Sequence, residues 1–317
     1  MNDIAVPFVG AETVERLLDY PSLVTSIRAA FIDPPTTPLR IAIPIPETQQ
    51  QAGGTALVMP ALRSAGLLGV KIIAIHPKLS TRPGGATRAV YVAIDANSGE
   101  LKGLIDGHAL TLRRTAATSI LATRSLARPN PETVVVIGTG SLAKCLARAY
   151  AETFGPRELL IWGRDHSKAQ ALANGVVESG IEARAALDLA DAVGSADVIT
   201  SATLATDPIV LGRHVRPGTH VDLVGGFTRE MREADDDLIS KAIIVADVET
   251  TVTEAGDLAQ PLERGIIRKE RIITVRQVLT GVGPGRQSES DVTLFKSAGH
   301  ALEDLAAAEL LFQRWVS

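Results

Sequence analysis

The spacing of apolar residues along the chain changes from one segment to the next. Residues 11–32 carry apolar side chains at helical spacing, and Pro21 interrupts the pattern, so two short amphipathic helices are expected. Residues 39–107 contain short apolar or β-branched runs separated by Gly, Pro and Asn-Ser-Gly turns. The runs are LRIAIPI, TALVMPAL, LLGVKIIAIH, AVYVAID and LKGLIDG. No helix-length pattern separates them, which predicts a mostly antiparallel meander.

The second half of the chain alternates between strand and helix patterns. Residues 109–128 predict a long helix that ends before Pro129. The apolar runs that follow are VVVI, ELLIW, DVITSA, THVDLVG and AIIVAD, and helically spaced segments separate them. This order is typical of a doubly wound parallel sheet. The tail from Thr293, TLFKSAGHALEDLAAAELLF, predicts a helix whose apolar face could return to the first part of the chain.

These patterns predict an α/β protein with two domains, which 317 residues accommodate comfortably. We expect a Rossmann-type doubly wound parallel sheet over residues 129–297. We expect a mostly antiparallel α+β substrate domain over residues 1–128, completed by a C-terminal helix at 298–317.

Composition narrows the class of protein and its partners. Apolar residues make up 45% of the chain and charged residues 21%, with a net charge of −4, as in an ordinary globular protein. No basic run or aromatic-interleaved patch points to nucleic acid, and no apolar run is long enough to span a membrane. No signal-peptide pattern opens the chain. The one cysteine, Cys145, suits a reducing compartment, so we expect a cytoplasmic protein.

A glycine turn follows the first strand of the second half. Gly138, Gly140 and Ala143 form a GxGxxA pattern between an apolar strand and a helix. The first glycine permits the tight turn, the second lets the backbone approach a pyrophosphate, and the alanine allows close packing of helix and strand. The sequence therefore predicts a dinucleotide site, with Ser141 and Leu142 at the start of the helix also in contact with the cofactor.

The end of the next strand indicates which dinucleotide binds. An NAD site usually carries an acid there for the ribose 2′-hydroxyl, but the chain has Gly163 and Arg164. Asp165 is more simply the N-cap of the following helix. Arginine suits a 2′-phosphate, so NADPH is the favoured cofactor and NADH a weaker one. A solvated surface role for Arg164 is the alternative.

Three cations lie in or next to apolar runs of the first domain: Arg40, Lys71 and Arg114. Lys71 interrupts a strand whose neighbours are nearly all apolar, and a buried lysine is costly unless it is paired. Each could be a snorkelling or edge cation, and this is the simpler interpretation for Arg40. Together they could bind the carboxylate of an anionic substrate held against a nicotinamide.

Five more positions are candidate cofactor contacts: Thr115, Thr203, Leu204, Val224 and Lys296. Helix packing is an equally good explanation for Thr115. Thr203, Leu204 and Val224 follow strands of the parallel sheet, where the nicotinamide half of a dinucleotide usually lies. The histidines have no cysteine or carboxylate partner at metal spacing, so no metal is expected.

The chain resembles the ornithine cyclodeaminase/mu-crystallin family. The motifs are LRRTAATSILATRSLA, VVVIGTGSLA, EAGDL, PGR and TLFKSAGHALEDLAAA, in that order. The resemblance implies a Rossmann domain, a substrate domain whose sheet pairs in a homodimer, and a substrate carboxylate bound by Arg40, Lys71 and Arg114. It also places the loop with Glu254 and Asp257 near the site, although a surface turn is the default interpretation of that loop.

One position departs from the cyclodeaminase and alanine dehydrogenase branches. After the Gly-Gly pair of DLVGGFTREMRE, where those branches carry an aspartate implicated in acid–base chemistry, this chain has Phe227. A phenyl ring cannot transfer the proton that deamination requires, whereas reduction of a ready-made cyclic ketimine needs hydride and one proton. Phe227 would then be an apolar wall beside the substrate. Alternatively Phe227 is only packing, and a base lies elsewhere, with Asp222 and Glu230 close in sequence.

The resemblance to the reductase branch of this family, together with Arg164, implies an NADPH-dependent ketimine reductase that converts the small imino acid Δ1-pyrroline-2-carboxylate to L-proline, and the six-membered piperideine analogue to L-pipecolate. Arg40 and Arg114 would hold the carboxylate, and Lys71 would donate the proton or orient the carboxylate. The alternatives are an ornithine cyclodeaminase or other NAD-dependent amino-acid dehydrogenase, and a non-catalytic nucleotide-loaded binding protein.

Overall fold

The computed structural model describes residues 6–48, 53–76, 78, 86–178 and 180–315. The chain divides into two compact units. Unit 1 comprises Met1–Ala117 with His300–Ser317, and unit 2 comprises Thr118–Gly299. The boundary falls inside the helix α3 (Gly107–Leu126) rather than after it, so this helix contributes residues to both units.

Unit 1 is built on a six-stranded sheet with the order β1-β6-β5-β4-β3-β2. The strands are β1 (Phe8–Val9), β2 (Ile41–Ile45), β3 (Gly54–Leu62), β4 (Leu67–Ile75), β5 (Thr87–Asp95) and β6 (Leu101–Asp106). Strands β2 to β6 pair antiparallel in chain order, which confirms the predicted meander. Strand β1 adds a parallel pair to β6 and was not predicted, because two residues are too few to show a period.

The helices of unit 1 are α1 (Ala11–Leu17), α2 (Tyr20–Ile32) and α11 (Ala301–Trp315), with the first half of α3. The expected break at Pro21 is wrong, because the helix pair divides at Leu18 and Asp19. The Asp19 carboxylate caps α2 by accepting the Ser22 N–H at 2.9 Å. Pro21 lies in the first turn of α2, where a missing N–H breaks no helical bond.

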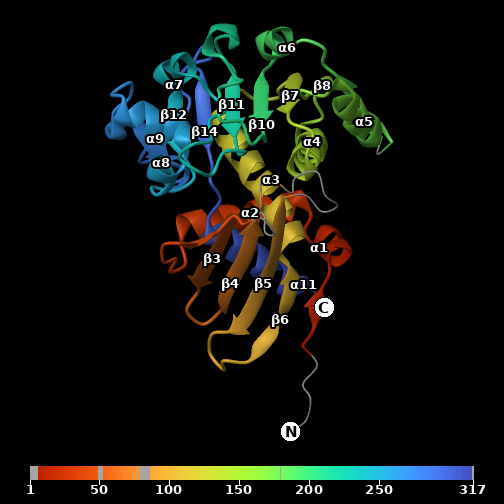
Figure 1. Ribbon diagram of the computed structural model, residues 1–317, viewed down its shortest axis with the longest axis vertical. Helices are drawn as coiled ribbons and strands as arrows, with labels where there is room; N and C mark the ends of the chain where they lie inside the picture. Colours follow the sequence, from red (N-terminus) through yellow and green to blue (C-terminus); the bar gives the residue numbers. More distant parts are fainter. Residues whose placement is uncertain (1–5, 49–52, 77, 79–85, 179, 316–317) are drawn as a thin grey trace. The chain divides into compact units, whose positions relative to one another are not determined.

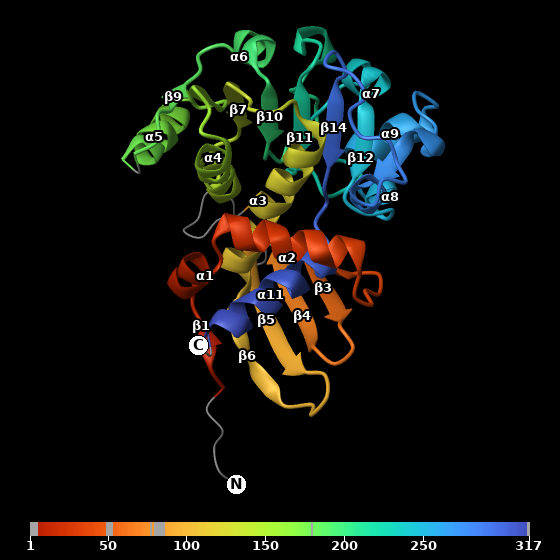
Figure 2. The same cartoon turned by 180° about the vertical axis from the view of Figure 1, so that it is seen from behind.

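The two faces of the unit 1 sheet differ in what covers them. Figure 1 shows the sheet from the face that no helix of the described residues covers, called here the uncovered face, and Figure 2 from the face on which α2 and α11 lie. Lys71 lies opposite Met59 and Tyr91 in the antiparallel register, and all three are buried. The next position, Ile72, points to the other face and is 45% exposed.

Unit 2 is built on an eight-stranded sheet, parallel at every described pairing, with the order β13-β12-β14-β11-β10-β7-β8-β9. The strands are β7 (Thr133–Ile137), β8 (Glu158–Trp162), β9 (Arg184–Ala185), β10 (Val198–Ser201), β11 (His220–Leu223), β12 (Ile243–Ala246), β13 (Ile272–Thr274) and β14 (Thr293–Lys296). This confirms the Rossmann-type fold. The strand order reverses between β7 and β10, and right-handed crossovers therefore place helices on both faces.

The α-helices of unit 2 besides α3 are α4 (Ser141–Phe154), α5 (His166–Val177), α6 (Leu189–Ser195), α7 (Asp236–Lys241), α8 (Thr251–Glu254), α9 (Gly256–Glu263) and α10 (Val275–Leu279). Short 3-10 turns lie at Gly212–His214 and Lys269–Arg271. Helices α4 and α5 pack against β8. The residues Val134, Val135 and Val136 of β7 have no exposed surface, since the sheet is covered on both sides.

The prediction of one helix from Thr293 onward is wrong at its start. Thr293–Lys296 is β14, which lies between β11 and β12 inside the parallel sheet. Gly299 has a left-handed backbone conformation (φ +76°), which separates β14 from α11, and that helix begins at Ala301. A strand buried on both faces is a continuous apolar run, so its four residues were not distinguishable from the first turn of a helix.

No helix in the part of the chain that the structure describes is both long and apolar enough to cross a lipid bilayer.

Candidate active site

The glycine turn after β7 has the backbone geometry of a dinucleotide loop. Gly138 has φ +127°, and a Cβ there would lie 2.7 Å from the carbonyl oxygen of Ala202, so only glycine fits. Gly140 is the N-cap of α4, and a Cβ there would meet no atom within 4 Å. The loop is therefore tight against the sheet at Gly138 and open on the outer side at Gly140.

The start of α4 is free to receive an anion. Its N-cap makes no side-chain hydrogen bond to the first turn, and Gly140 and Ser141 are exposed while Leu142 is half-buried. The N–H groups of a helix start, with the helix dipole, attract phosphate oxygens. Ala143 is fully buried beneath the turn, as the GxGxxA pattern requires.

The end of β8 packs closely on the same turn. A Cβ at Gly163 would lie 2.5 Å from the Thr139 methyl group, so glycine is needed for this approach. The Asp165 carboxylate accepts the N–H of Ser167 at 3.0 Å and that of Lys168 at 3.3 Å, which confirms its predicted role as N-cap of α5. Asp165 is thus engaged by its own helix, and Arg164 is an exposed cation beside the turn.

Unit 1 contains a buried cluster of two cations and two carboxylates. Lys71 Nζ lies 2.9 Å from Oδ1 and 2.8 Å from Oδ2 of Asp304 on α11. Arg114 Nε donates to the same Asp304 at 2.9 Å, and its Nη1 donates to Glu303. Lys71 is 1% exposed and Arg114 4%, while both acids have no exposed surface. The four formal charges cancel, which is what makes their burial tolerable.

Burial and mutual interaction shift the titration of this cluster. Desolvation, with Arg114 nearby, lowers the pKa of the Lys71 ammonium to about 8, against the opposing pull of Asp304. This agrees in direction with the expected effect of burial and a neighbouring guanidinium. Desolvation acts to raise the pKa of Asp304, but the charges of Lys71 and Arg114 outweigh it and lower that pKa. Lys71 is therefore a cation that can lose its proton near neutral pH.

Arg40 directly precedes β2, whose first described pairing is Ile41 with Val58. Arg40 is half-buried, and its part in carboxylate binding stays a prediction.

Sequence reasoning missed the two acids that hold the cations. Glu303 and Asp304 are adjacent in α11, in the otherwise apolar stretch ALEDLAAA. Two acids in the apolar run of a helix were the available signal, since buried carboxylates need partners. The sequence could not say that Lys71 and Arg114 were those partners.

The segment after β11 carries Phe227, which is half-buried. The two carboxylates considered as alternative bases lie in different settings. Asp222 is fully buried within β11, where it accepts from Tyr150 Oη at 3.0 Å and Thr200 Oγ1 at 2.6 Å, and burial raises its pKa to about 6. Glu230 is exposed, and its pKa is lowered chiefly by a hydrogen bond from Thr228. The core location of Asp222 does not suit a base that meets a ligand.

The other predicted cofactor contacts lie in both units. Thr203, Leu204 and Val224 follow β10 and β11 at the carboxyl edge of the parallel sheet, on the side of the switch point away from β8. Thr115 is buried in the unit 1 part of α3. Lys296 ends β14, has no exposed surface, and lies 2.9 Å from Asp257 Oδ2. Contact of these residues with a cofactor stays a prediction.

The default interpretation of the EAGDL loop as a surface turn is wrong for Asp257. This residue lies in α9 with no exposed surface, and its Oδ1 accepts the N–H groups of Glu233 and Ala234 at 2.7 and 2.9 Å. The carboxylate is thus bound inside unit 2, because the preceding glycine lets α9 approach the 225–233 segment. A Cβ at Gly256 would lie 2.4 Å from two carbonyl oxygens of that segment.

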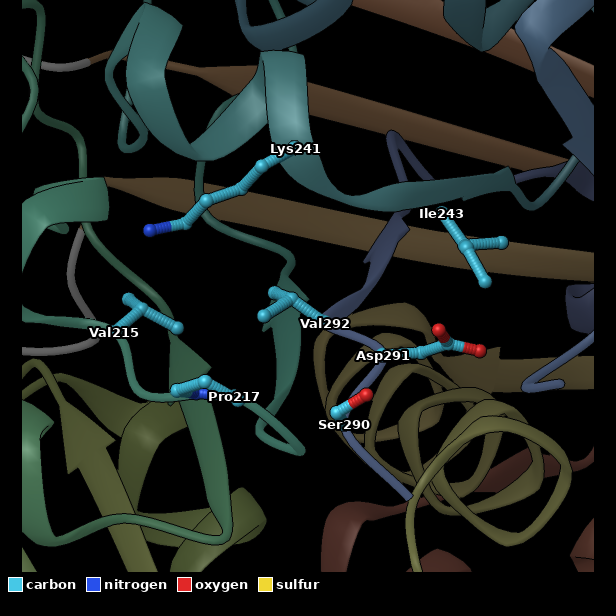
Figure 3. A pocket seen from close by; sticks show the side chains of 7 residues that line it. All are labelled: Val215, Pro217, Lys241, Ile243, Ser290, Asp291 and Val292. Carbon is cyan, nitrogen blue, oxygen red and sulfur yellow. The ribbon is translucent and has the colours of Figure 1, made fainter. Parts of the chain in front are cut away.

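A cavity of about 320 Å³ lies at the opposite, amino-terminal edge of the unit 2 sheet (Figure 3). Its lining comes from the segments that precede β11 and β14, and from Lys241 and Ile243 at the start of β12. Lys241 Nζ donates to Gly212 O, and Asp291 accepts the N–H groups of Gln287 and Ser288. Its charged groups are therefore engaged by the protein, and ligands of such sheets bind at the carboxyl edge instead. In the described ranges, no group of three or more His, Cys, Asp and Glu side chains is arranged to hold a metal ion.

The fold and these residues define a class: a protein with a Rossmann-type dinucleotide-binding unit and an antiparallel α+β unit that carries a buried cation cluster. The chain belongs to the ornithine cyclodeaminase/mu-crystallin family, whose model matches residues 10–317. The resemblance seen in the sequence is thereby confirmed.

Individual relatives match over most of their length. The chain is 36% identical to Delta(1)-pyrroline-2-carboxylate reductase of Paracoccus denitrificans, over 90% of this chain and 86% of that protein. It is 30% identical to rat ketimine reductase mu-crystallin, over 88% and 85%. The solved structure of Thermococcus litoralis Delta(1)-pyrroline-2-carboxylate reductase with NADH and L-proline has a TM-score of 0.91 and 28% identity, and the match covers 98% of both chains.

Proposed function

We propose that this protein is an NADPH-dependent reductase of a cyclic ketimine carboxylate, with Δ1-pyrroline-2-carboxylate as substrate and L-proline as product. The observation that carries the proposal is the Lys71–Asp304–Arg114 cluster, in which two buried cations share one carboxylate and one of them titrates near neutral pH. The similarity to pyrroline-2-carboxylate reductases over most of the chain supports the same reaction. The protein is accordingly an oxidoreductase that acts on a C=N bond.

The dinucleotide is assigned to the carboxyl edge of the unit 2 sheet. Gly138, Gly140 and Ser141 would hold the pyrophosphate at the start of α4, because the turn is open there and the helix N–H groups lack a side-chain cap. Arg164 would bind the 2′-phosphate, and this cation supports NADPH over NADH. When bound, the reduced nicotinamide supplies the hydride.

The substrate carboxylate is assigned to unit 1. Arg114, whose Nε and Nη1 also bind Asp304 and Glu303, and Arg40, which directly precedes β2, are the proposed carboxylate ligands. The cluster is neutral by itself, so the carboxylate of a neutral ketimine adds one negative charge to it. Arg40 can offset that charge.

The proton is assigned to Lys71. Hydride addition at C2 breaks the π bond of C=N, and the nitrogen of a neutral ketimine takes up one proton to give the neutral ring amine. A second proton from solvent then gives the ammonium form of L-proline. A lysine whose pKa is lowered to about 8 can donate the first proton at neutral pH and recover it from solvent. Asp304 and Arg114 fix the position of its ammonium group.

Phe227 supports reduction rather than deamination. Release of ammonia from an amino acid requires a base and attack by water, and a half-buried phenyl ring offers neither. The phenyl ring can instead pack against the apolar ring of the substrate. The six-membered piperideine analogue is proposed as a second substrate, since one added methylene changes binding only modestly.

A homodimer is proposed through the uncovered face of the unit 1 sheet. Ile72 on this face is 45% exposed, and Ile41 and Ile43 on the edge strand are 56% and 49% exposed. An apolar sheet face of this kind is typical of a surface that pairs with another chain. The single cysteine, Cys145, fits a reducing, cytoplasmic compartment.

The test is a direct assay with matched reactions. The purified protein is mixed with NADPH and Δ1-pyrroline-2-carboxylate, and the absorbance of the reduced nicotinamide is followed. In parallel, ornithine and NAD⁺ are tested for ammonia release. Oxidation of NADPH with formation of L-proline supports the proposal. Ammonia release from ornithine without ketimine reduction would show a cyclodeaminase, and cofactor binding without either reaction would show a non-catalytic binding protein.

A further inference from the structure

A single buried carboxylate joins two loops at the carboxyl edge of the unit 2 sheet. Glu233 Oε1 accepts Ser201 Oγ at 2.6 Å and both N and Oγ1 of Thr203 at 2.8 Å, all at the end of β10. Glu233 Oε2 accepts the N–H groups of Gly225 at 2.9 Å and Gly226 at 3.3 Å, after β11. Glu233 has no exposed surface.

The two loops are in direct contact at the same point. A Cβ at Gly225 would lie 2.1 Å from the carbonyl oxygen of Thr203 and 2.6 Å from Glu233 Oε1. Glycine at this position therefore allows the loops to meet, and the carboxylate then binds the N–H groups of both. We name the segments 201–205 and 224–227, joined in this way, the paired loops.

Glu233 is itself held in place by buried charges. Its N–H donates to Asp257 Oδ1 at 2.7 Å, and the other carboxylate oxygen of Asp257 lies 2.9 Å from Lys296 Nζ. Its carbonyl oxygen accepts the N–H groups of Ile209 and Val210 at 2.9 and 2.8 Å. Asp257 and Lys296, like Glu233, have no exposed surface. The carboxylate is thus fixed from the backbone side and cannot follow a loop that moves.

In all five hydrogen bonds the oxygens of the Glu233 carboxylate are the acceptors. Both oxygens face backbone N–H groups, which cannot turn away as hydroxyl groups can. A glutamine would place its NH₂ group against a backbone N–H in either amide orientation, leaving buried donors unpaired. Glu233→Gln therefore disrupts the link between the two loops without changing the size of the side chain.

We propose that Glu233 is a positioning residue for the nicotinamide half of the dinucleotide, acting by fixing the paired loops. This inference rests on the proposed cofactor site. The strand order reverses between β7 and β10, so the adenosine half belongs to the Gly138 turn and the end of β8, and the nicotinamide half to the ends of β10 and β11. Fixed loops hold the reacting ring in one orientation, which hydride transfer requires.

The test compares two ligands with no substrate present. NADPH occupies both halves of the site, whereas adenosine 2′,5′-bisphosphate lacks the nicotinamide. For Glu233→Gln we expect the dissociation constant of NADPH to rise at least about tenfold, as loss of one to two hydrogen bonds predicts, with that of the bisphosphate unchanged. Equal weakening of both ligands, or of neither, would contradict the proposal.

Asp197→Asn is the matched control. Asp197 Oδ2 accepts the N–H groups of Glu132 and Thr133 at 2.9 and 3.1 Å and its Oδ1 accepts two arginine donors, so an amide there places its NH₂ group against donors as well. It lies before β10, at the amino-terminal edge of the same sheet. We expect this variant to lose stability while both dissociation constants stay unchanged, which separates positioning from a general effect on folding.

A second variant covers the case in which Glu233→Gln does not fold. Gly225→Ala keeps the carboxylate but forces the loops apart, because the methyl group has no room against Thr203. We expect the same selective loss of NADPH binding, and unchanged NADPH binding in this variant would overturn the proposal. Absence of ketimine reduction by the unaltered protein would contradict only the proposed reaction, since the binding comparison needs no turnover.

Discussion

The Lys71 ammonium lies 2.9 Å from the Asp304 carboxylate, and neither side chain is more than 1% exposed. Arg114 donates to the same carboxylate, so Asp304 holds two cations that are far apart in the chain. Burial and Arg114 weaken the hold of Lys71 on its proton, whereas Asp304 strengthens it. This balance gives the lysine its proposed role and leads to the first two predictions.

Activity should fall as the pH rises through about 8. The pKa of Lys71 is lowered to about 8, so its side chain is mostly protonated below that pH and mostly neutral above it. A plot of kcat/KM against pH should therefore fall on its alkaline side. Lys71→Met should lower kcat at least about 100-fold, in the range of general acid catalysis.

Lys71→Arg separates the two roles considered for this residue. Arginine keeps the positive charge for a carboxylate but does not release a proton near pH 8. Loss of kcat with little change in KM would identify Lys71 as the proton donor, and retained turnover would show a carboxylate ligand only. Lys102→Met, an exposed lysine of β6, should leave both constants unchanged.

Asp304→Asn should destabilise the protein by about 3–5 kcal/mol, because it leaves Lys71 and Arg114 buried with half of their countercharge. Urea unfolding followed by circular dichroism measures the loss. Glu47→Gln, which removes the partner of the exposed Lys78, is the control and should have a much smaller effect. An Asp304→Asn variant with unchanged stability would contradict the view that this acid supports the cluster.

The stability of unit 2 should depend on Asp222. Its pKa is raised from 3.8 unfolded to about 6 folded, so the folded state holds the proton more tightly. The tighter proton binding therefore stabilises the folded state fully below about pH 4. The free energy of unfolding falls by up to about 3 kcal/mol as the pH rises from there to above 6. In Asp222→Asn that fall should be absent from the unfolding free energy measured between pH 4 and 7.

Tyr150→Phe is the control for Asp222. It removes the hydrogen bond of 3.0 Å to the carboxylate but keeps the titrating group, so the fall with pH should persist. An unchanged pH dependence in Asp222→Asn would show that another group is responsible.

Arg164 should decide the preference between the two nicotinamide cofactors. Arg164→Ala removes an exposed cation beside the glycine turn, and we expect KM for NADPH to rise about 10- to 100-fold while KM for NADH stays nearly unchanged. Lys168→Ala, an exposed cation in the first turn of α5, should change neither value. Equal effects on both cofactors would argue against a 2′-phosphate contact.

Ile72→Asp should convert the proposed dimer to a monomer, because it places a charge on the uncovered apolar face of the unit 1 sheet. Size-exclusion chromatography with light scattering gives the mass directly. Leu187→Asp changes a residue that is 84% exposed in unit 2 and should leave the mass unchanged. A dimeric Ile72→Asp protein would mean that the chains pair elsewhere or not through this face.

The sequence by itself determined the features that depend on neighbouring residues. Gly138 marks the tight turn because few other residues allow its φ of +127°, and Asp165 marks a helix start because its side chain binds the N–H groups of Ser167 and Lys168. The strands β2 to β8 and β10 to β12 were also readable, since each is an apolar segment between turn residues, whereas β1, β9, β13 and β14 were not predicted.

Only the tertiary structure decided which distant groups meet. Thr293–Lys296 is a strand because β11 and β12 pair with it, although the run has no period of its own. Asp304 is the partner of Lys71, and Glu233 joins two loops, through contacts that no local spacing encodes. Buried charges must be paired, but the partner is fixed by how the elements pack and not by distance along the chain.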